Sequence, residues 1–122
     1  MIRGLHLLLL SQDPAADRAF LRDVLGWPWV EDQASEPGWL IFETPPTEMG
    51  VHPVSGRPGV ALHLMCDGIA ATVAELKAKG VPVGEVVNAG YGLATTVTLP
   101  SGAEVGLYEP RHKSPLAAFD RT

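Results

Sequence analysis

The chain has 122 residues and a mass of 13.0 kDa, with 46% apolar and 19% charged residues, which is the composition of one globular domain. Nine basic residues, scattered along the chain, stand against fourteen acidic ones and leave a net charge of -5, so neither nucleic acid nor an anionic membrane is an expected partner. A single cysteine, Cys66, excludes an intramolecular disulfide, and the apolar run Leu5 to Leu10 is far shorter than the roughly 18 residues of a membrane span. These features predict a soluble, cytoplasmic, single-domain protein.

The first half of the chain begins with an apolar run that predicts a strand from Leu5 to Ser11. Asp13 and Pro14 then have the character of a helix N-cap and first helical residue, and Gly26 that of a residue just past a helix C-terminus. Three further strands are predicted, with turns at Ser35 to Gly38 and at Pro45-Pro46 between them: Trp27 to Asp32, Trp39 to Glu43, and Glu48 to Val54.

The second half follows a linker at Ser55 to Gly59 and has the same order of elements. Val60 to Cys66 predicts a strand, and Asp67 is expected to cap a helix that ends at Gly80. Three strands are again predicted: Gly84 to Asn88, Tyr91 to Leu99, and Ala103 to Glu109.

The landmarks of the two halves keep a constant offset, since Asp67 lies 54 residues after Asp13 and Gly80 lies 54 residues after Gly26. The offset indicates two copies of one βαβββ unit, although two ordinary α+β stretches could match by coincidence. The fold expected is therefore α+β, with one module over about 1–56, a second over about 57–111, and a C-terminal tail over 112–122.

Four segments carry a resemblance to a known family: Gly4 to His6, Phe20 to Gly26, Ala71 to Gly80, and Pro100 to Pro110. With the repeated βαβββ unit, they make the chain similar to the vicinal oxygen chelate (VOC) superfamily, which contains glyoxalase I, extradiol dioxygenases and bleomycin-resistance proteins. The resemblance implies curved mixed sheets that form a ligand cleft. It does not select a reaction, because one fold carries many activities.

The metal enzymes of this superfamily place ligands on the first and last strands of each module. The resemblance carries these positions to His6, His52, Ala61 and Gly106, and the last two have no donor atom. His63 follows Ala61 by two residues and is expected on the same face. Either His6, His52 and His63 bind a divalent metal ion, or they are polar groups in a ligand cavity; the incomplete ligand set favours no metal and no other cofactor.

Strand alternation predicts which other side chains face the cleft. Val105 and Leu107 are expected to face a helix, which leaves Glu104, Gly106 and Tyr108 on the concave face. The aromatic side chains either fill the core or line the cleft for a flat ligand. The candidate aromatic ligand-binding residues are Trp29, Trp39, Phe42, Tyr91 and Tyr108.

Two classes of function stay open at this point. The first is a metal-free protein that binds a small apolar or aromatic molecule, as the antibiotic-sequestering members do; the second is a metal-dependent enzyme similar to glyoxalase I or an extradiol dioxygenase. The missing donors at Ala61 and Gly106 favour the first. Isolated four-stranded modules would expose strand edges, so a homodimer is expected.

Four further residues are expected to have no part in the chemistry. Cys66 is interpreted as a structural thiol, Glu104 and Glu109 as surface charges, and His112 as part of a solvated tail.

Overall fold

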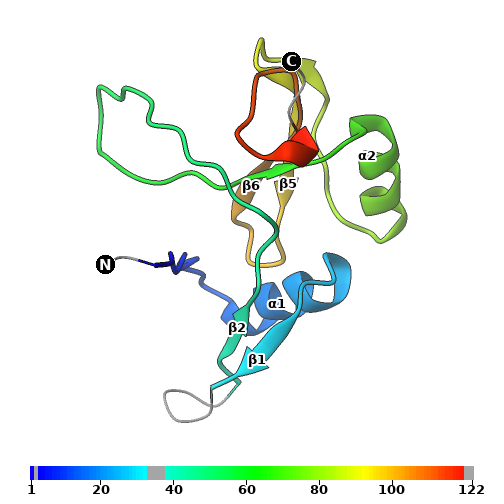
Figure 1. Cartoon of the computed structure of the whole chain (residues 1–122). Coiled ribbons are helices and arrows are strands. Elements are labelled where there is room, and N and C mark those ends of the chain that lie inside the picture. The colour runs from blue at the N-terminus through cyan, green and yellow to red at the C-terminus, as the bar shows by residue number, and fades with distance from the viewer. Residues whose placement is uncertain (2, 33–37, 120–122) are drawn as a thin grey trace.

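The structure is a computed structural model that describes residues 1, 3–32 and 38–119. It has the α+β architecture that the sequence predicts, with one two-stranded and one four-stranded sheet and few helices (Figure 1). The two sheets belong to the two halves of the chain. No helix among the described residues is both long and apolar enough to cross a membrane.

The second half forms a complete βαβββ unit. Its sheet has the order β3-β6-β5-β4, in which β3 is parallel to β6 and the other neighbours are antiparallel. The elements are β3 (His63–Met65), α2 (Ile69–Ala78), β4 (Val87–Asn88), β5 (Gly92–Thr98) and β6 (Glu104–Pro110). The predicted order of elements is therefore confirmed in this half, although β3 is shorter than the predicted strand.

The two long strands of this sheet divide their side chains between a core and an open face. Val97 of β5 and Val105 and Leu107 of β6 are buried in the core together with Ile69 and Leu76 of α2. Alternate residues of β6 point the other way, as the period of two along a strand requires. The core thus lies between the sheet and α2, and the opposite face is left for a site.

The first half forms only part of the predicted module. Its elements are α1 (Pro14–Ala19), a π-helical turn η1 (Phe20–Val24), and the antiparallel pair β1 (Trp29–Glu31) and β2 (Leu40–Phe42). The Asp13 side chain caps α1 by accepting a hydrogen bond from the Ala16 amide, and Gly26 has the positive φ of 70° predicted for a helix C-terminus. Of the predicted turn at 35–38, residues 35–37 lie outside the described residues.

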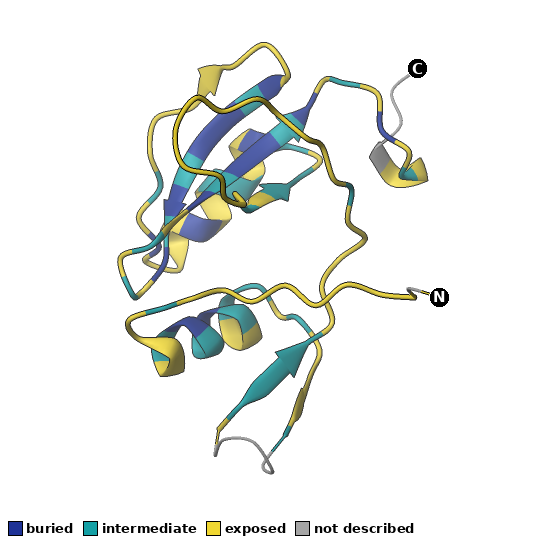
Figure 2. Cartoon of the chain, turned by 90° about the vertical axis from the view of Figure 1, so that its left-hand side faces the viewer, coloured by how far each residue is buried: buried dark blue, intermediate teal, exposed yellow. Residues whose placement is uncertain are grey.

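Two predicted strands of the first half are absent from the described chain. Leu5 to Ser11 and Glu48 to Val54 form no strand, and most of their residues are exposed, up to 83% at Leu10 and 98% at Val51 (Figure 2). The prediction was wrong here because a strand needs a hydrogen-bonded neighbour as well as an apolar pattern, and neither segment has such a neighbour in a single chain.

The two halves share one core. Phe20 of η1 is only 5% exposed and belongs to the same cluster as the buried residues of α2, β5 and β6. The Asp17 carboxylate of α1 accepts a hydrogen bond from the Ser101 amide in the β5–β6 turn, at 3.0 Å. Lys79, just after α2, donates to the Val24 carbonyl at 3.3 Å. The first helix therefore packs against the second half.

Replacing Phe20 with alanine tests this shared core. Phe20→Ala removes a buried aromatic ring and should lower the free energy of unfolding by about 3–5 kcal/mol. Urea denaturation measures the loss, and Phe42→Ala is the matched control because Phe42 is half-buried and outside the core cluster. Equal losses in the two variants, or two separate unfolding transitions, would contradict a core common to both halves.

Candidate functional site

The open face of the four-stranded sheet carries a cavity of about 640 Å³. The residues that line it come from all four strands of this sheet, the segments before β3 and β4, the β4–β5 turn, and one N-terminal residue. They are Leu9, Val60, Ala61, Leu62, His63, Glu85, Val87, Ala89, Tyr91, Ala94, Thr95, Thr96, Glu104, Val105 and Gly106. Most are apolar, and the central positions on β5 and β6 are small, so the sheet itself forms the floor.

Gly106 has a steric role in this floor. It lies opposite His63 in the parallel β3–β6 pair, and a Cβ atom at position 106 would overlap the imidazole ring of His63. The ring therefore occupies the space that a side chain at position 106 would take. The absence of a side chain at Gly106 is what allows the His63 ring to lie across the sheet.

Aromatic rings gather at one end of the cavity. The Tyr108 ring makes an edge contact with Tyr91 at 5.2 Å between centroids and with His63 at 6.1 Å, with interplanar angles of 87° and 88°. Such near-perpendicular pairs are favoured by the quadrupole of aromatic rings. Since Tyr91 and His63 line the cavity, this cluster of three rings supplies flat apolar surface at its edge.

A polar network behind Tyr108 joins the C-terminal segment to the first half of the chain. The Tyr108 hydroxyl lies 3.0 Å from His112 Nε2 and 3.4 Å from Glu48 Oε1, and Glu48 Oε2 accepts a hydrogen bond from Ser114 at 2.5 Å. Ser114 is buried and His112 half-buried, so the expectation that His112 belongs to a solvated tail was wrong. Neither Glu48 nor Ser114 had a sequence signal, since only the tertiary fold brings them to Tyr108.

Burial raises the pKa of Tyr108 above the ordinary value of about 10, and the neighbouring Glu48 carboxylate raises it further. Tyr108 is therefore a neutral phenol at physiological pH and can donate a hydrogen bond. Burial also raises the pKa of the Cys66 thiol, which keeps it protonated and poorly nucleophilic. A protonated thiol of this kind agrees with the structural role predicted for Cys66.

Glu109 is not a free surface charge, as the sequence suggested, but a helix cap. Its Oε1 accepts a hydrogen bond from the Ile69 amide at the first residue of α2, at 3.1 Å. The predicted cap, Asp67, makes no such bond, and the N-cap position is Gly68. The Glu109 carboxylate on β6 thus pairs with a backbone N–H at the start of α2 that no side chain next to it in sequence caps.

Of the eight ligand-binding residues proposed from sequence, the structure brings three together: His63, Tyr91 and Tyr108. His6 and His52 lie on the exposed unpaired segments, where His52 Nδ1 is 2.9 Å from the Pro53 carbonyl.

The other three lie on or beside the β1–β2 sheet, outside the lining of this cavity: Trp29, Trp39 and Phe42. The guanidinium of Arg18 lies 5.3 Å from the centre of the Trp39 ring and covers one of its faces.

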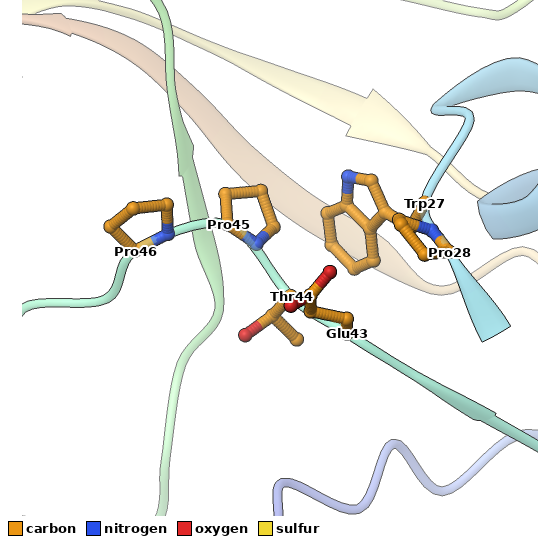
Figure 3. Close-up of a pocket in the computed structure, with 6 residues that line it drawn as sticks. All are labelled: Trp27, Pro28, Glu43, Thr44, Pro45 and Pro46. Carbon is orange, nitrogen blue, oxygen red and sulfur yellow. The ribbon is translucent and has the colours of Figure 1, made fainter.

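A second depression of about 450 Å³ lies in the first half (Figure 3). Trp27 and Pro28 face Pro45 and Glu43 across it, and Thr44 and Pro46 complete the lining. None of the residues proposed from sequence lines it. The cavity over the four-stranded sheet is therefore the stronger candidate site.

The metal-ligand positions implied by the family resemblance do not fit a metal ion here. Ala61 and Gly106 have no donor atoms, and the His63 ring fills the space above Gly106. Across residues 1, 3–32 and 38–119, no group of three or more His, Cys, Asp or Glu side chains is placed to hold a metal ion. His6, His52 and His63 are not brought together in the single chain.

The ionisation of Tyr108 tests the polar network. Because burial is the larger cause of its raised pKa, Glu48→Gln should lower that pKa only part of the way toward 10. The phenolate ultraviolet absorbance can be titrated in a Tyr91→Phe background, where Tyr108 is the only tyrosine. Since the folded pKa is the higher one, the contribution of Tyr108 to stability is lost as the pH rises above about 10.

Glu104→Gln is the control for this titration, since it removes one charge from the same strand without touching Tyr108. It should leave the Tyr108 pKa nearly unchanged. An equal pKa in the parent and in Glu48→Gln would show that the Glu48 carboxylate does not act on the phenol.

No protein-family model and no curated protein matches the sequence. Solved structures do match the fold. TnmS3, an antibiotic binding protein from Streptomyces sp. CB03234, has a TM-score of 0.66 and 24% identity, over 89% of this chain and 97% of that one. A lactoylglutathione lyase from Agrobacterium tumefaciens has a TM-score of 0.60 and 20% identity, over 88% and 92%.

A third match is the fosfomycin resistance protein FosX from Listeria monocytogenes, with a TM-score of 0.58 and 18% identity over 90% of this chain and 93% of that one. The three matches differ in function, and their low identities establish the fold alone. The resemblance drawn from the sequence is thereby confirmed at the level of the fold: the chain has the fold of these antibiotic-binding, lactoylglutathione lyase and fosfomycin resistance structures.

Proposed function

We propose that the protein binds a small planar aromatic molecule in the cavity over the four-stranded sheet, without a metal ion, and acts by sequestering it as an antibiotic-binding protein does. The observation that carries the proposal is the floor of the cavity. Ala61 and Gly106 bring no metal-donor atom to this floor, the His63 ring lies over Gly106, and the space that stays open is bordered by the rings of His63 and Tyr91. The similarity in fold to the antibiotic binding protein TnmS3 supports the same reading.

The size of the cavity agrees with a ligand of a few fused rings. Burying about 200 Å² of apolar ligand surface contributes roughly 5 kcal/mol before the cost of association. Micromolar affinity corresponds to about 8 kcal/mol, so the remainder has to come from ring contacts and hydrogen bonds. The imidazole of His63 and the hydroxyl of Thr96 are polar groups in the lining that can orient such a ligand.

Filling the cavity should abolish this binding. Ala61→Trp places a large ring at an exposed lining position, while Ala70→Trp makes the same change on the exposed surface of α2. Calorimetry with tricyclic aromatic probes (proflavine, a neutral hydroxyanthraquinone and anthraquinone-2-sulfonate) should show micromolar binding of at least one probe to the parent. Ala70→Trp should retain that binding and Ala61→Trp should lose it.

Added chelator should leave the affinity unchanged, because the proposed site uses no metal. Metal analysis of protein purified without chelator should find less than one equivalent of any transition metal. Binding that requires an added divalent metal, or the absence of binding by every probe, would overturn the proposal.

We also propose that the functional unit is a homodimer. The segments Leu5 to Leu10 and Gly50 to Val54 have strand-like sequences, yet in the single chain they lack strand partners and expose Leu10 and Val51 almost fully. Exposed apolar segments with unpaired backbone are suited to pairing with another chain. Two-fold pairing of two copies would cover both segments in each, and would bring His6 and His52 into a sheet.

Sedimentation should therefore give about twice the mass of 13.0 kDa at micromolar concentration. Val51→Lys should weaken the dimer, because a charge would be buried where Val51 is covered, whereas Ala70→Lys on α2 should not. A monomer in the parent protein, or equal dimer stability in both variants, would exclude this assembly without affecting the fold.

A further inference from the structure

The charged groups that line the cavity over the four-stranded sheet are of one sign. Glu85 and Glu104 are among its lining residues, and no lysine or arginine is among them in the described part of the chain. The other titratable side chains of the lining are His63 and Tyr91. A ligand that enters therefore meets carboxylates and no fixed positive charge, in a protein whose net charge is already -5.

The two carboxylates lie toward the same end of the sheet. Glu104 is the first residue of β6, two residues before Gly106, and Gly106 pairs with Thr96 on β5. Glu85 follows Gly84, whose amide donates a hydrogen bond to the Thr96 carbonyl at 2.9 Å. Both glutamates are thus near the Thr96–Gly106 pair, Glu104 on the interior strand β6 and Glu85 in the segment that leads to the edge strand β4.

The aromatic rings lie toward the other end. Tyr108 is four residues beyond Glu104 on β6, which corresponds to about 13 Å along an antiparallel strand. The Tyr91 ring packs against Tyr108 there. The cavity therefore has an aromatic end at Tyr91 and an anionic end at Glu104, and the His63 ring lies over Gly106 between them.

A third carboxylate adds to the negative potential at the aromatic end. The Glu48 Oε1 atom lies 3.4 Å from the Tyr108 hydroxyl. His112 Nε2 also lies 3.4 Å from Glu48 Oε1, and a protonated His112 would offset part of the Glu48 charge. The ring face of a tyrosine attracts cations by itself. Neither end of the cavity is therefore suited to an anion.

We infer that the ligand is a planar aromatic cation, with its rings against Tyr91 and His63 and a protonated amine between Glu85 and Glu104. The inference rests on the proposed function, because it assigns the charge of the molecule that this cavity binds. An anionic aromatic of the same shape would be repelled by the two carboxylates, and an uncharged one would gain no attraction from them. The two glutamates are then specificity residues of the site.

The test compares three tricyclic probes of similar size by calorimetry at neutral pH and low ionic strength: proflavine as the cation, a hydroxyanthraquinone as the neutral compound, and anthraquinone-2-sulfonate as the anion. Proflavine should bind about tenfold more tightly than the sulfonate, since each partly exposed carboxylate contributes a few-fold. Added sodium chloride should weaken proflavine binding and leave that of the neutral probe unchanged.

Charge-neutralising variants assign the effect to the two residues. Glu85→Gln and Glu104→Gln should each weaken proflavine binding about two- to fivefold, and together about tenfold, without changing the affinity of the neutral probe. Glu75→Gln is the matched control, because it removes the same charge from the exposed surface of α2, outside the cavity. It should have no effect on any probe.

The possible failures are distinguishable. If the neutral or anionic probe binds as tightly as proflavine, and Ala61→Trp still removes that binding, the cavity binds aromatics but the inference about charge is wrong. If proflavine is preferred but Glu75→Gln reduces its affinity as much as the cavity variants do, the preference is a property of the net charge and the two residues are not specificity residues. If no probe binds, the proposed function fails and the inference fails with it.

Discussion

The antiparallel pairing of β5 with β6 is the interaction on which the rest of the structure depends. Its register runs from Gly92 opposite Pro110 to Thr98 opposite Glu104, and it gives one sheet two different faces. Val97, Val105 and Leu107 on one face meet α2 and form the core, while Gly106 on the other face forms part of the cavity floor and Tyr108 packs against Tyr91 at the edge of the cavity. A slip by one residue would exchange the two faces and destroy both.

The first half depends on this sheet for its stability. Its own β1–β2 pair is too small to enclose a core, and Phe20 supplies the contact that joins α1 and η1 to the second half. Because the first half has no larger sheet of its own, Leu5 to Leu10 and Gly50 to Val54 have no strand partners in the single chain. Exposed apolar segments with unpaired backbone favour pairing with another chain, and this is the basis of the proposed homodimer.

The C-terminal segment contributes more than its sequence suggests. Through Ser114 and His112 it holds Glu48, which comes from the long connection between the halves, against the hydroxyl of Tyr108. Tyr108, which packs against Tyr91 at the edge of the cavity, is therefore held by groups from two distant parts of the chain.

The sequence by itself determined the elements whose signals are local. Helix boundaries at Asp13 and Gly26 follow from backbone chemistry, and the alternation in β6 correctly separated Leu107 from Tyr108, because the period of a strand is fixed by its geometry. Only the tertiary structure decided which extended segments became strands, since a strand exists only with a neighbour. The tertiary structure also decided the roles of Glu109 and His112. Glu109 accepts a hydrogen bond from the Ile69 amide, 40 residues away, and His112 contacts Tyr108 from beyond the last strand. Neither interaction leaves a periodic pattern in the sequence.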